Sequence, residues 1–226
     1  MDNSYSNYHA LETAITKRFS DRWQAAATYT LSGTWNYYPE PINPGCVGPI
    51  NGLTMTCDKY FKVQPDLGGE YGLRGAGGVY TVSEPDQRHR LVVNGLYELP
   101  GGFQLSGLYF YSSGVRQANT YGQDLRGVVP PFGVAEYGFG RLRSDGTVSP
   151  RNSVLNDPIH RVDLRVQWRL KAGRTNIMPL VEVFNLFDNT NFTRSWVELN
   201  PFYGKPIGQT IGSGYRVVQL GFRTTF

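Results

Sequence analysis

Charged residues alternate with hydrophobic ones along one short stretch of the chain, and this row is the best candidate for chemistry. The row consists of Arg161, Asp163, Arg165 and Arg169. A period of two places these side chains on one face of a β-strand. Such a row could attract anionic substrates as a basic wall. It could also form ion pairs across the sheet, for example with Glu182 or Glu98, and we favour ion pairing because opposite charges on facing strands stabilise a sheet.

The other residue types argue against catalysis. His9, His89 and His160 are far apart in the sequence, and none belongs to a metal-binding or triad pattern, so we interpret all three as structural. No phosphate-binding or nucleophile-elbow motif is present, so we expect neither an enzyme nor a cofactor. The net charge of +4 is spread out, which does not favour nucleic acid as a partner.

Two cysteines, Cys46 and Cys57, lie in a stretch rich in glycine and proline. A disulfide closing so short a loop would stabilise the protein by roughly 3 kcal/mol in the chain-entropy model. An oxidising compartment would permit it. Two unpaired thiols are the alternative, whereas a metal site is disfavoured because no histidine lies near. We predict the disulfide.

Aromatic residues occur repeatedly in segments without any periodicity. Their rings could stack on a sugar or a metal chelate, although packing within loops would explain them too. These residues are Trp35, Tyr37, Tyr38, Tyr60, Tyr121, Tyr137, Trp196 and Tyr203.

Seven strands are predicted to position these candidates, because hydrophobic and polar residues alternate in seven segments. The segments are 8–18, 23–32, 90–99, 103–112, 161–170, one around 180–185, and 215–226. The sixth is the weakest, because Val181 and Val183 share a face with Asn185. Pro179 is expected near the start of that strand, since proline cannot donate to a ladder.

The predicted connections alternate strictly between short and long. The long ones cover 33–87, 114–158 and 188–214, and none of them shows periodicity. A barrel inserted from one side has brief turns at one end and extended loops at the other. Strands of about ten residues also suit a tilted crossing of a bilayer. We therefore predict an all-β fold, an antiparallel up-and-down transmembrane β-barrel segment of about seven strands, a partial barrel with long extracellular loops.

Composition agrees with this fold class. Aromatic residues make up 14% of the chain and charged residues only 18%, with 27 glycines. No run of 18 apolar residues exists, so no transmembrane helix is expected. Trp23, Phe103 and Phe226 lie at short-turn ends of strands and Tyr111 near a long-loop end, as interfacial girdles require. Ordinary β-propensity is the alternative explanation for these aromatics.

Several sequence segments resemble the C-terminal barrel region of TonB-dependent outer-membrane receptors. They are Tyr8–Glu12 leading to Lys17–Phe19, Tyr29–Ser32, Asp86–Arg90 with Leu99–Phe103, Val181–Asp188, and the closing strand Tyr215–Phe226. The resemblance covers most of the predicted strands and none of the long loops. Five segments in the family's order are fairly specific, although each alone is weak.

The resemblance implies a 22-stranded barrel with an N-terminal plug that takes up siderophore-bound metals, cobalamin or oligosaccharides using force from TonB. This sequence lacks the plug, the TonB-contacting segment and most strands, so residues 1–226 are expected to be the C-terminal portion of such a barrel. TonB would then act only through the missing region. Nor do the first residues form an export signal, so a protein outside the cytoplasm would have been cut before Met1.

The expected location is therefore the outer membrane, with the lipid bilayer as one partner. We expect the barrel-assembly machinery to bind the closing strand, whose outward residues are Val218, Leu220, Phe222 and Phe226. Two alternatives stay open. One is a self-contained adhesin or structural barrel that closes by oligomerising, and the other is a soluble carbohydrate-binding β-sandwich. The ligand itself, a small molecule or an oligosaccharide, is not identified by the sequence.

Overall fold

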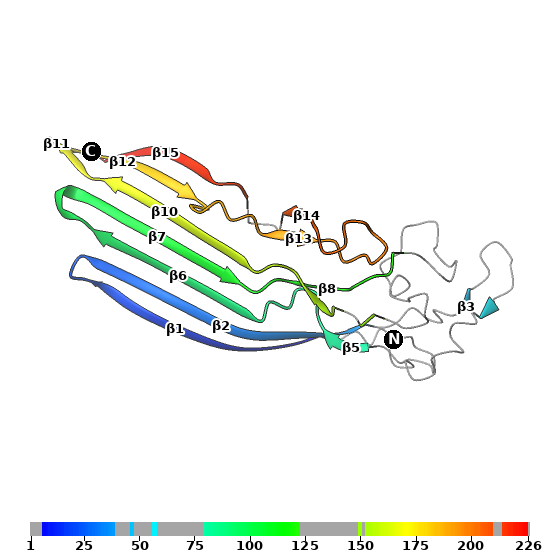
Figure 1. The fold of residues 1–226 in the computed structure, drawn as a ribbon. Coiled ribbons are helices and arrows are strands. Elements are labelled where there is room, and N and C mark those ends of the chain that lie inside the picture. Colours follow the sequence, from blue (N-terminus) through cyan, green and yellow to red (C-terminus); the bar gives the residue numbers. More distant parts are fainter. Residues whose placement is uncertain are drawn as a thin grey trace.

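Seven long antiparallel strands form one sheet in the order of the chain (Figure 1). They are β1 (Ser6–Ser20), β2 (Trp23–Tyr38), β6 (His89–Glu98), β7 (Phe103–Ser112), β10 (Ile159–Trp168), β12 (Thr175–Phe184) and β15 (Val217–Thr225). This computed structural model describes residues 6–38, 46–47, 56–57, 79–122, 149–150, 152–209 and 214–225, with backbone only at 37, 38, 46, 47, 56, 57 and 79. Each long strand pairs with the next, so the predicted up-and-down all-β fold is confirmed.

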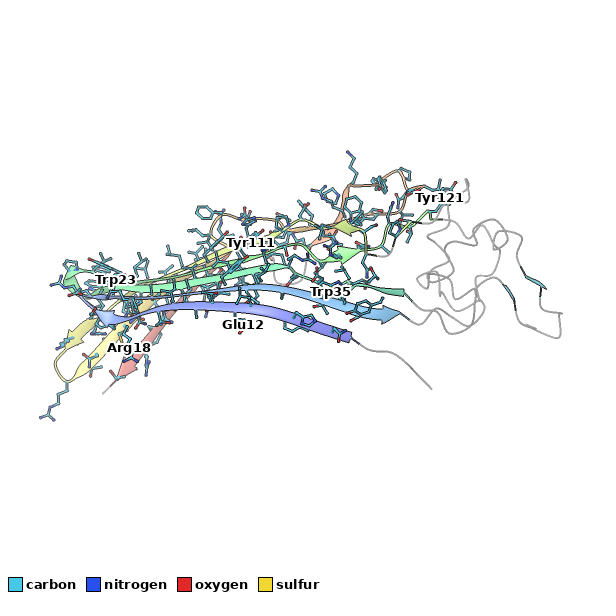
Figure 2. All side chains as sticks on the ribbon, turned by 90° about the horizontal axis from the view of Figure 1, so that it is seen from below. Glu12, Arg18, Trp23, Trp35, Tyr111 and Tyr121 are labelled. Carbon is cyan, nitrogen blue, oxygen red and sulfur yellow. The ribbon has the colours of Figure 1, made fainter. Side chains whose placement is uncertain are left out.

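The sheet is twisted and open. Strands β1 and β15 are its two long edges, and within the described residues they do not pair with each other. Nearly every residue of both edge strands is exposed. The described strands therefore form a curved wall and not a closed barrel (Figures 1 and 2).

The short connections lie together at one end of the sheet. Asp21 and Arg22 turn the chain between β1 and β2 with positive φ angles of 50° and 70°. A 3-10 turn at Pro100–Gly102 joins β6 to β7. Gly102, with φ of 85°, leaves room for the backbone of β10, because a Cβ there would lie 2.7 Å from the carbonyl oxygen of Arg169. The third short connection is the turn between β11 (Leu170–Ala172) and β12.

The long connections contain short strands that the sequence did not reveal. β2 continues to Tyr38 and pairs with β5 (Val79–Val82). Three further pairs are β3 (Cys46–Val47) with β4 (Thr56–Cys57), β8 (Arg116–Gln117) with β9 (Val154–Leu155), and β13 (Phe192–Arg194) with β14 (Pro206–Gln209). The prediction that 33–87, 114–158 and 188–214 lack regular structure was wrong at these places. Segments of two to four residues are too short to show a period of two.

Pro179 lies in the middle of β12, not near its start as predicted. It is tolerated there because the ladder between the neighbouring strand and β12 is interrupted at this point. Gln167 pairs with Leu180 and Leu170 with Ile177, but Trp168 and Arg169 form no ladder pairs with β12. The N–H of Arg169 donates instead to the carbonyl oxygen of Gly102, at 2.8 Å. Proline therefore occupies the position where no donor is needed.

The register places one row of mainly apolar residues from each long strand on the same side of the sheet. Directly opposed residues in an antiparallel ladder share a face. One such line runs across five strands through Ile15, Ala27, Val93, Tyr109 and Val162. A slip of one residue anywhere would have broken this line.

This hydrophobic side is not covered by other parts of the described structure. Ile159 is the one buried hydrophobic residue among the described positions, whereas Leu220 and Phe222 are 75% and 76% exposed. The residues in the part of the chain that the structure describes thus enclose no dry hydrophobic core. None of the described helices is long and apolar enough to span a lipid bilayer.

Candidate functional site

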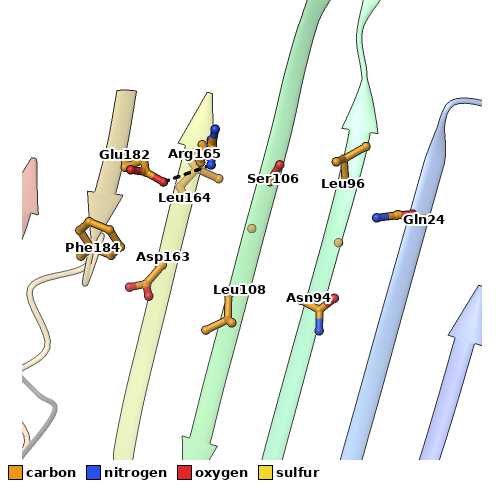
Figure 3. Close-up of a pocket in the computed structure, with 12 residues that line it drawn as sticks. Gln24, Asn94, Leu96, Ser106, Leu108, Asp163, Leu164, Arg165, Glu182 and Phe184 are labelled. Carbon is orange, nitrogen blue, oxygen red and sulfur yellow. Dashed lines mark ion pairs between the residues drawn. The ribbon is translucent and has the colours of Figure 1, made fainter. Parts of the chain in front are cut away.

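The other side of the sheet is polar, and the charged row lies on it. Arg165 is the register partner of Glu182, and their side chains form an ion pair with 3.6 Å between Nη1 and Oε1 (Figure 3). Arg161 donates from Nε to Oδ1 of Asp163 at 2.8 Å. Arg165 also donates to the amide oxygen of Gln167. Three of the four row residues are therefore engaged in ion pairs.

Ion pairing balances most of the charge on this face. Glu98, the other acidic partner considered, pairs in register with Gln104 on β7 and so lies two strands away from the row. Arg169 follows β10 at the turn end of the sheet and is exposed. The hollow on the polar side is lined by Gln24, Asn94, Ser106, Asp163, Arg165 and Glu182 among others (Figure 3). It presents mixed hydrogen-bonding groups and not a purely basic wall.

A buried carboxylate organises the long-loop end of β2 and β6. Asp86 is 1% exposed and accepts the backbone N–H of Thr34 at 2.9 Å and Nε of Arg116 at 3.1 Å. Arg88 approaches the same carboxylate at 3.7 Å. Because a buried charge is stable only when it is paired and hydrogen-bonded, Asp86 holds the chain after β7 against the end of β2.

Replacing Asp86 by asparagine is expected to lower the free energy of unfolding by about 2 kcal/mol, the cost of losing charge-assisted bonds at a buried site. Urea unfolding of the protein in lipid vesicles, followed by tryptophan fluorescence, measures the change. Glu84→Gln is the matched control, because Glu84 is exposed and the same substitution there should change stability by less than about 0.5 kcal/mol. Equal effects of the two variants would refute the buried-carboxylate account.

A second polar cluster joins the chain before β10 to the β13–β14 hairpin. Arg194 forms a two-pronged ion pair with Asp157, at 2.8 Å from Nε and 2.7 Å from Nη2, and donates to the carbonyl oxygen of Gly204. The hydrogen bond to Asp157 raises the pKa of Arg194 above its ordinary value. Asn156 is buried and accepts from the backbone of Arg194 and from the indole of Trp196. The hairpin is thus fixed to the sheet by directional contacts.

The structure brings only some of the predicted loop aromatics together. Trp196 and Tyr203 pack edge to face with 5.8 Å between ring centroids, and the backbone of Tyr121 accepts a hydrogen bond from the same hairpin. Trp35 does not join them. Its ring contacts His9 and Gly33 on the hydrophobic side of the sheet. Figure 2 shows Trp35 and Tyr121 toward the long-loop end and Trp23 at the turn end.

Other predicted aromatics cannot be placed. Only the backbones of Tyr37 and Tyr38 are described, and Tyr60 and Tyr137 lie outside the described residues. Of the predicted loop aromatics, the structure thus groups Trp196 and Tyr203, with Tyr121 beside them, and contact of this group with a ligand stays a prediction.

Comparison with known proteins decides the class to which this sheet belongs. A protein-family model described as an outer membrane beta barrel domain matches residues 1–131, more than half of the 226-residue chain. The chain belongs to this outer-membrane β-barrel family. No curated protein and no solved structure shows a significant match. The family match does not distinguish TonB-dependent receptors from other outer-membrane barrels.

Membership in the barrel family identifies which side of the sheet faces lipid and which faces the barrel interior. The protein is located in the outer membrane, so the exposed hydrophobic side faces lipid and the polar side faces the barrel interior. The alternative of a soluble β-sandwich is wrong, because the family match places the protein in the outer membrane. In outer-membrane barrels the long loops are extracellular, which places the Asp86 cluster and the β13–β14 hairpin outside the cell.

The two cysteines of this barrel domain are brought into register. Cys46 on β3 directly opposes Cys57 on β4. Opposed residues in an antiparallel pair bring their Cβ atoms within about 4.5–5.5 Å, slightly more than the ≈ 3.5–4.5 Å usual in a disulfide. The side chains themselves lie outside the described part of the structure, so the disulfide stays a prediction.

The histidines of the barrel domain all lie on its lipid-facing side. His89 and His160 each contact a tyrosine hydroxyl through Nδ1, at 2.8 Å from Tyr29 and 3.1 Å from Tyr109. Among the described residues no three His, Cys, Asp or Glu side chains gather as metal ligands would.

The closing strand β15 is the edge predicted for the assembly machinery. Val218, Leu220 and Phe222 are all more than half exposed on its lipid-facing side, and Phe226 lies outside the described residues. Binding of the assembly machinery to this strand stays a prediction.

Sequence reasoning missed Asn185 as a structural centre. It follows β12 with a left-handed φ of 52° and is 4% exposed. Its side-chain amide donates to the carbonyl oxygens of Gly214 and Asn189, while its backbone N–H donates to Asp163. The segment Val181–Asp188 contains it, but neither composition nor periodicity indicates a buried asparagine.

Proposed function

We propose that this barrel domain is part of the wall of a TonB-dependent receptor that takes up a scarce nutrient of the siderophore, cobalamin or oligosaccharide class. The observation that carries the proposal is the organised rim at the long-loop end. A receptor that selects its ligand outside the cell needs loops held in fixed positions. A simple structural barrel has no such need.

Ion pairs and hydrogen bonds hold the parts of the rim together. Asp86 with Arg116 joins the end of β2 to the chain after β7, and Arg194 with Asp157 joins the β13–β14 hairpin to β10. The edge-to-face pair of Trp196 and Tyr203 belongs to the second of these assemblies. Aromatic rings on a rigid support favour stacking on the apolar faces of sugars or on planar chelates.

The open edges support a larger barrel. An unpaired strand edge in hydrocarbon costs several kcal/mol for each unsatisfied backbone group. We therefore propose that β1 and β15 pair with further barrel strands, and that the assembly machinery binds β15 while the barrel closes. TonB would act on a plug inside the completed barrel.

The same edges also suit a second candidate, an oligomeric barrel or adhesin closed by copies of this chain. The two candidates differ in the mass of the assembled protein. A single polypeptide with about 22 strands favours the receptor, whereas an assembly made only of 226-residue chains favours the oligomer.

Uptake by intact cells tests the proposed function. Cells that express the full-length protein are supplied separately with a radiolabelled ferric siderophore, cyanocobalamin and a maltooligosaccharide, in the presence and absence of TonB. We expect accumulation of one probe class that is lost without TonB. Accumulation that is equal in both strains, or absent for all three probes, would contradict the proposal.

A further inference from the structure

Three strands of the sheet repeat one spacing on the lipid-facing side. His9 and Lys17 on β1, His89 and Tyr97 on β6, and His160 and Trp168 on β10 are each eight residues apart. Eight is an even number, so both members of each pair point to the same side. Lys17 places its ammonium group 4.0 Å from the ring centre of Trp23 at the turn end. Each strand thus runs from a histidine to a residue of the turn-end belt.

The lipid-facing residues between these end points are uncharged. The lipid-facing positions are Leu11, Thr13 and Ile15 on β1, Leu91, Val93 and Gly95 on β6, and Val162, Leu164 and Val166 on β10. Eight residues at about 3.3 Å each span about 26 Å along a strand, or about 20 Å across the membrane at a tilt of ~40°. An outward apolar band is about 25 Å tall, so the histidines stand within about 5 Å of its extracellular border, a distance that an imidazole ring can reach across.

The register places the three histidines at one height. His9 pairs with Gly33, His89 with Leu31, and His160 lies in line with Tyr29 through Tyr111 and Leu91. From β1 to β6, and again from β6 to β10, the sheet advances by two strands. At each of these steps the histidine lies two residues nearer the turn end in the register of the ladder. Strands about 4.8 Å apart and tilted by ~40° shift by about one residue per strand. The register offset of two residues for every two strands therefore matches the tilt, and the three histidines lie at the same height in the membrane.

The aromatic belt at the turn end follows the same stagger. Trp23 and Tyr97 are register partners on β2 and β6, whereas Phe103 and Trp168 on the next two strands are register partners two residues nearer the turns. The same strand tilt thus makes the aromatic belt and the three histidines each parallel to the membrane plane. This agreement supports placing the three histidines at one height.

The contacts of two histidines prepare them to donate hydrogen bonds outward. When the hydroxyl of Tyr29 donates to Nδ1 of His89, the ring proton is on Nε2, and the same holds for Tyr109 with His160. His9 is placed by its edge contact with Trp35, at 6.0 Å between ring centres. His9 and His89 are exposed and His160 is half-buried.

We propose that His9, His89 and His160, the histidine row, bind the phosphate groups of outer-leaflet lipid. The row lies at headgroup height, offers donors to an anion that has only acceptors, and stands above an apolar band for the attached chains. This inference rests on the location in the outer membrane and not on nutrient uptake, so a negative uptake experiment leaves it standing.

Lipid retained by the purified full-length protein tests the proposal. The protein is reconstituted with a mixture of diphosphorylated lipid A and its dephosphorylated form, extracted in mild detergent, and analysed by native mass spectrometry. We expect the phosphorylated form to be retained roughly tenfold more, as one or two charge-assisted hydrogen bonds would give. Equal retention of the two forms by the wild-type protein would overturn the proposal.

Variants separate a phosphate site from general packing. The triple change His9→Leu, His89→Leu and His160→Leu should abolish the preference, whereas changing all three to Gln, which keeps a donor, should retain part of it. Arg90→Leu is the matched control, because Arg90 adjoins His89 but points to the barrel interior, and it should leave the preference unchanged. Heat-modifiable gel migration verifies that each variant is folded.

Two outcomes of the variant series would contradict the proposal. The first is an undiminished preference in the folded leucine variant. The second is loss of lipid binding on addition of inorganic phosphate alone, which would assign the row to a soluble anion and not to lipid.

Discussion

Replacing Val93 by arginine is expected to lower the free energy of unfolding in lipid vesicles by about 2–4 kcal/mol, the cost of an arginine on the lipid side near the bilayer midplane. Val93 is central in β6, midway between His89 and Tyr97, and its register partners Ala27 and Tyr109 are on the lipid-facing side. Urea titration measured by the shift between heat-modified and folded bands gives the change.

Asn94→Arg is the control that isolates the direction of the side chain. Asn94 is the next residue of the same strand, but it points to the polar interior, where it lies in register with Leu108, the partner of Asp163. Its stability should change by less than about 0.5 kcal/mol. If Asn94→Arg were the more damaging of the two, the assignment of lipid and interior sides would be reversed.

Asn185→Ala is expected to destabilise the protein by about 3 kcal/mol. The substitution removes the two hydrogen bonds that the buried side-chain amide donates to the carbonyl oxygens of Gly214 and Asn189, at about 1 kcal/mol each, and it forces alanine into a left-handed conformation at about 1 kcal/mol. Because Asn185 joins the end of β12 to β10 and to the start of β15, the last two strands should separate first. Hydrogen exchange of β15 amides reports that loss.

Asn185→Gly distinguishes the two contributions. Glycine adopts a φ of 52° without strain but lacks the side-chain amide. It should therefore be more stable than Asn185→Ala by about 1 kcal/mol and still less stable than the wild-type protein. A glycine variant as unstable as the alanine variant would show that the backbone conformation contributes nothing.

Most of the long strands were predictable because they have one mainly hydrophobic side and one mainly polar side over about ten residues, and the sixth was the weakest because its two sides are mixed. In β10 the hydrophobic residues Val162, Leu164 and Val166 alternate with Asp163 and Arg165, and the structure confirms that strand over Ile159–Trp168. The short turns between paired strands were predictable as well, because they contain turn-forming residues such as Pro100–Gly102. Local chemistry decides these features, so one sequence suffices.

The organisation of the rim was not predictable, since it depends on contacts between residues far apart in the chain. Asp86 is bonded to Thr34 on β2 and to Arg116 on β8, which are 52 and 30 residues away in the chain. Pro179 was misplaced because its position depends on an interruption of the neighbouring ladder. Asn185 was overlooked because a buried asparagine with four hydrogen bonds to three distant or following residues has no periodic signature.

The candidate ligand site was only partly predictable for the same reason. Aromatic composition indicated Trp196 and Tyr203, and the structure brings these two together. It also indicated Trp35, which lies on the lipid-facing side beside His9. Composition identifies residues capable of stacking, but only the register determines the side on which they stand.

Accessibility along β10 tests the central claim most directly. Single cysteines at positions 162 to 167, in the protein reconstituted in lipid bilayers, carry a nitroxide whose collisions with oxygen and with a water-soluble nickel chelate are measured by electron paramagnetic resonance. A lipid-facing side predicts that positions 162, 164 and 166 favour oxygen and that 163, 165 and 167 favour nickel. Loss of this alternation, or positions 162, 164 and 166 shielded from both reagents, would contradict a transmembrane sheet.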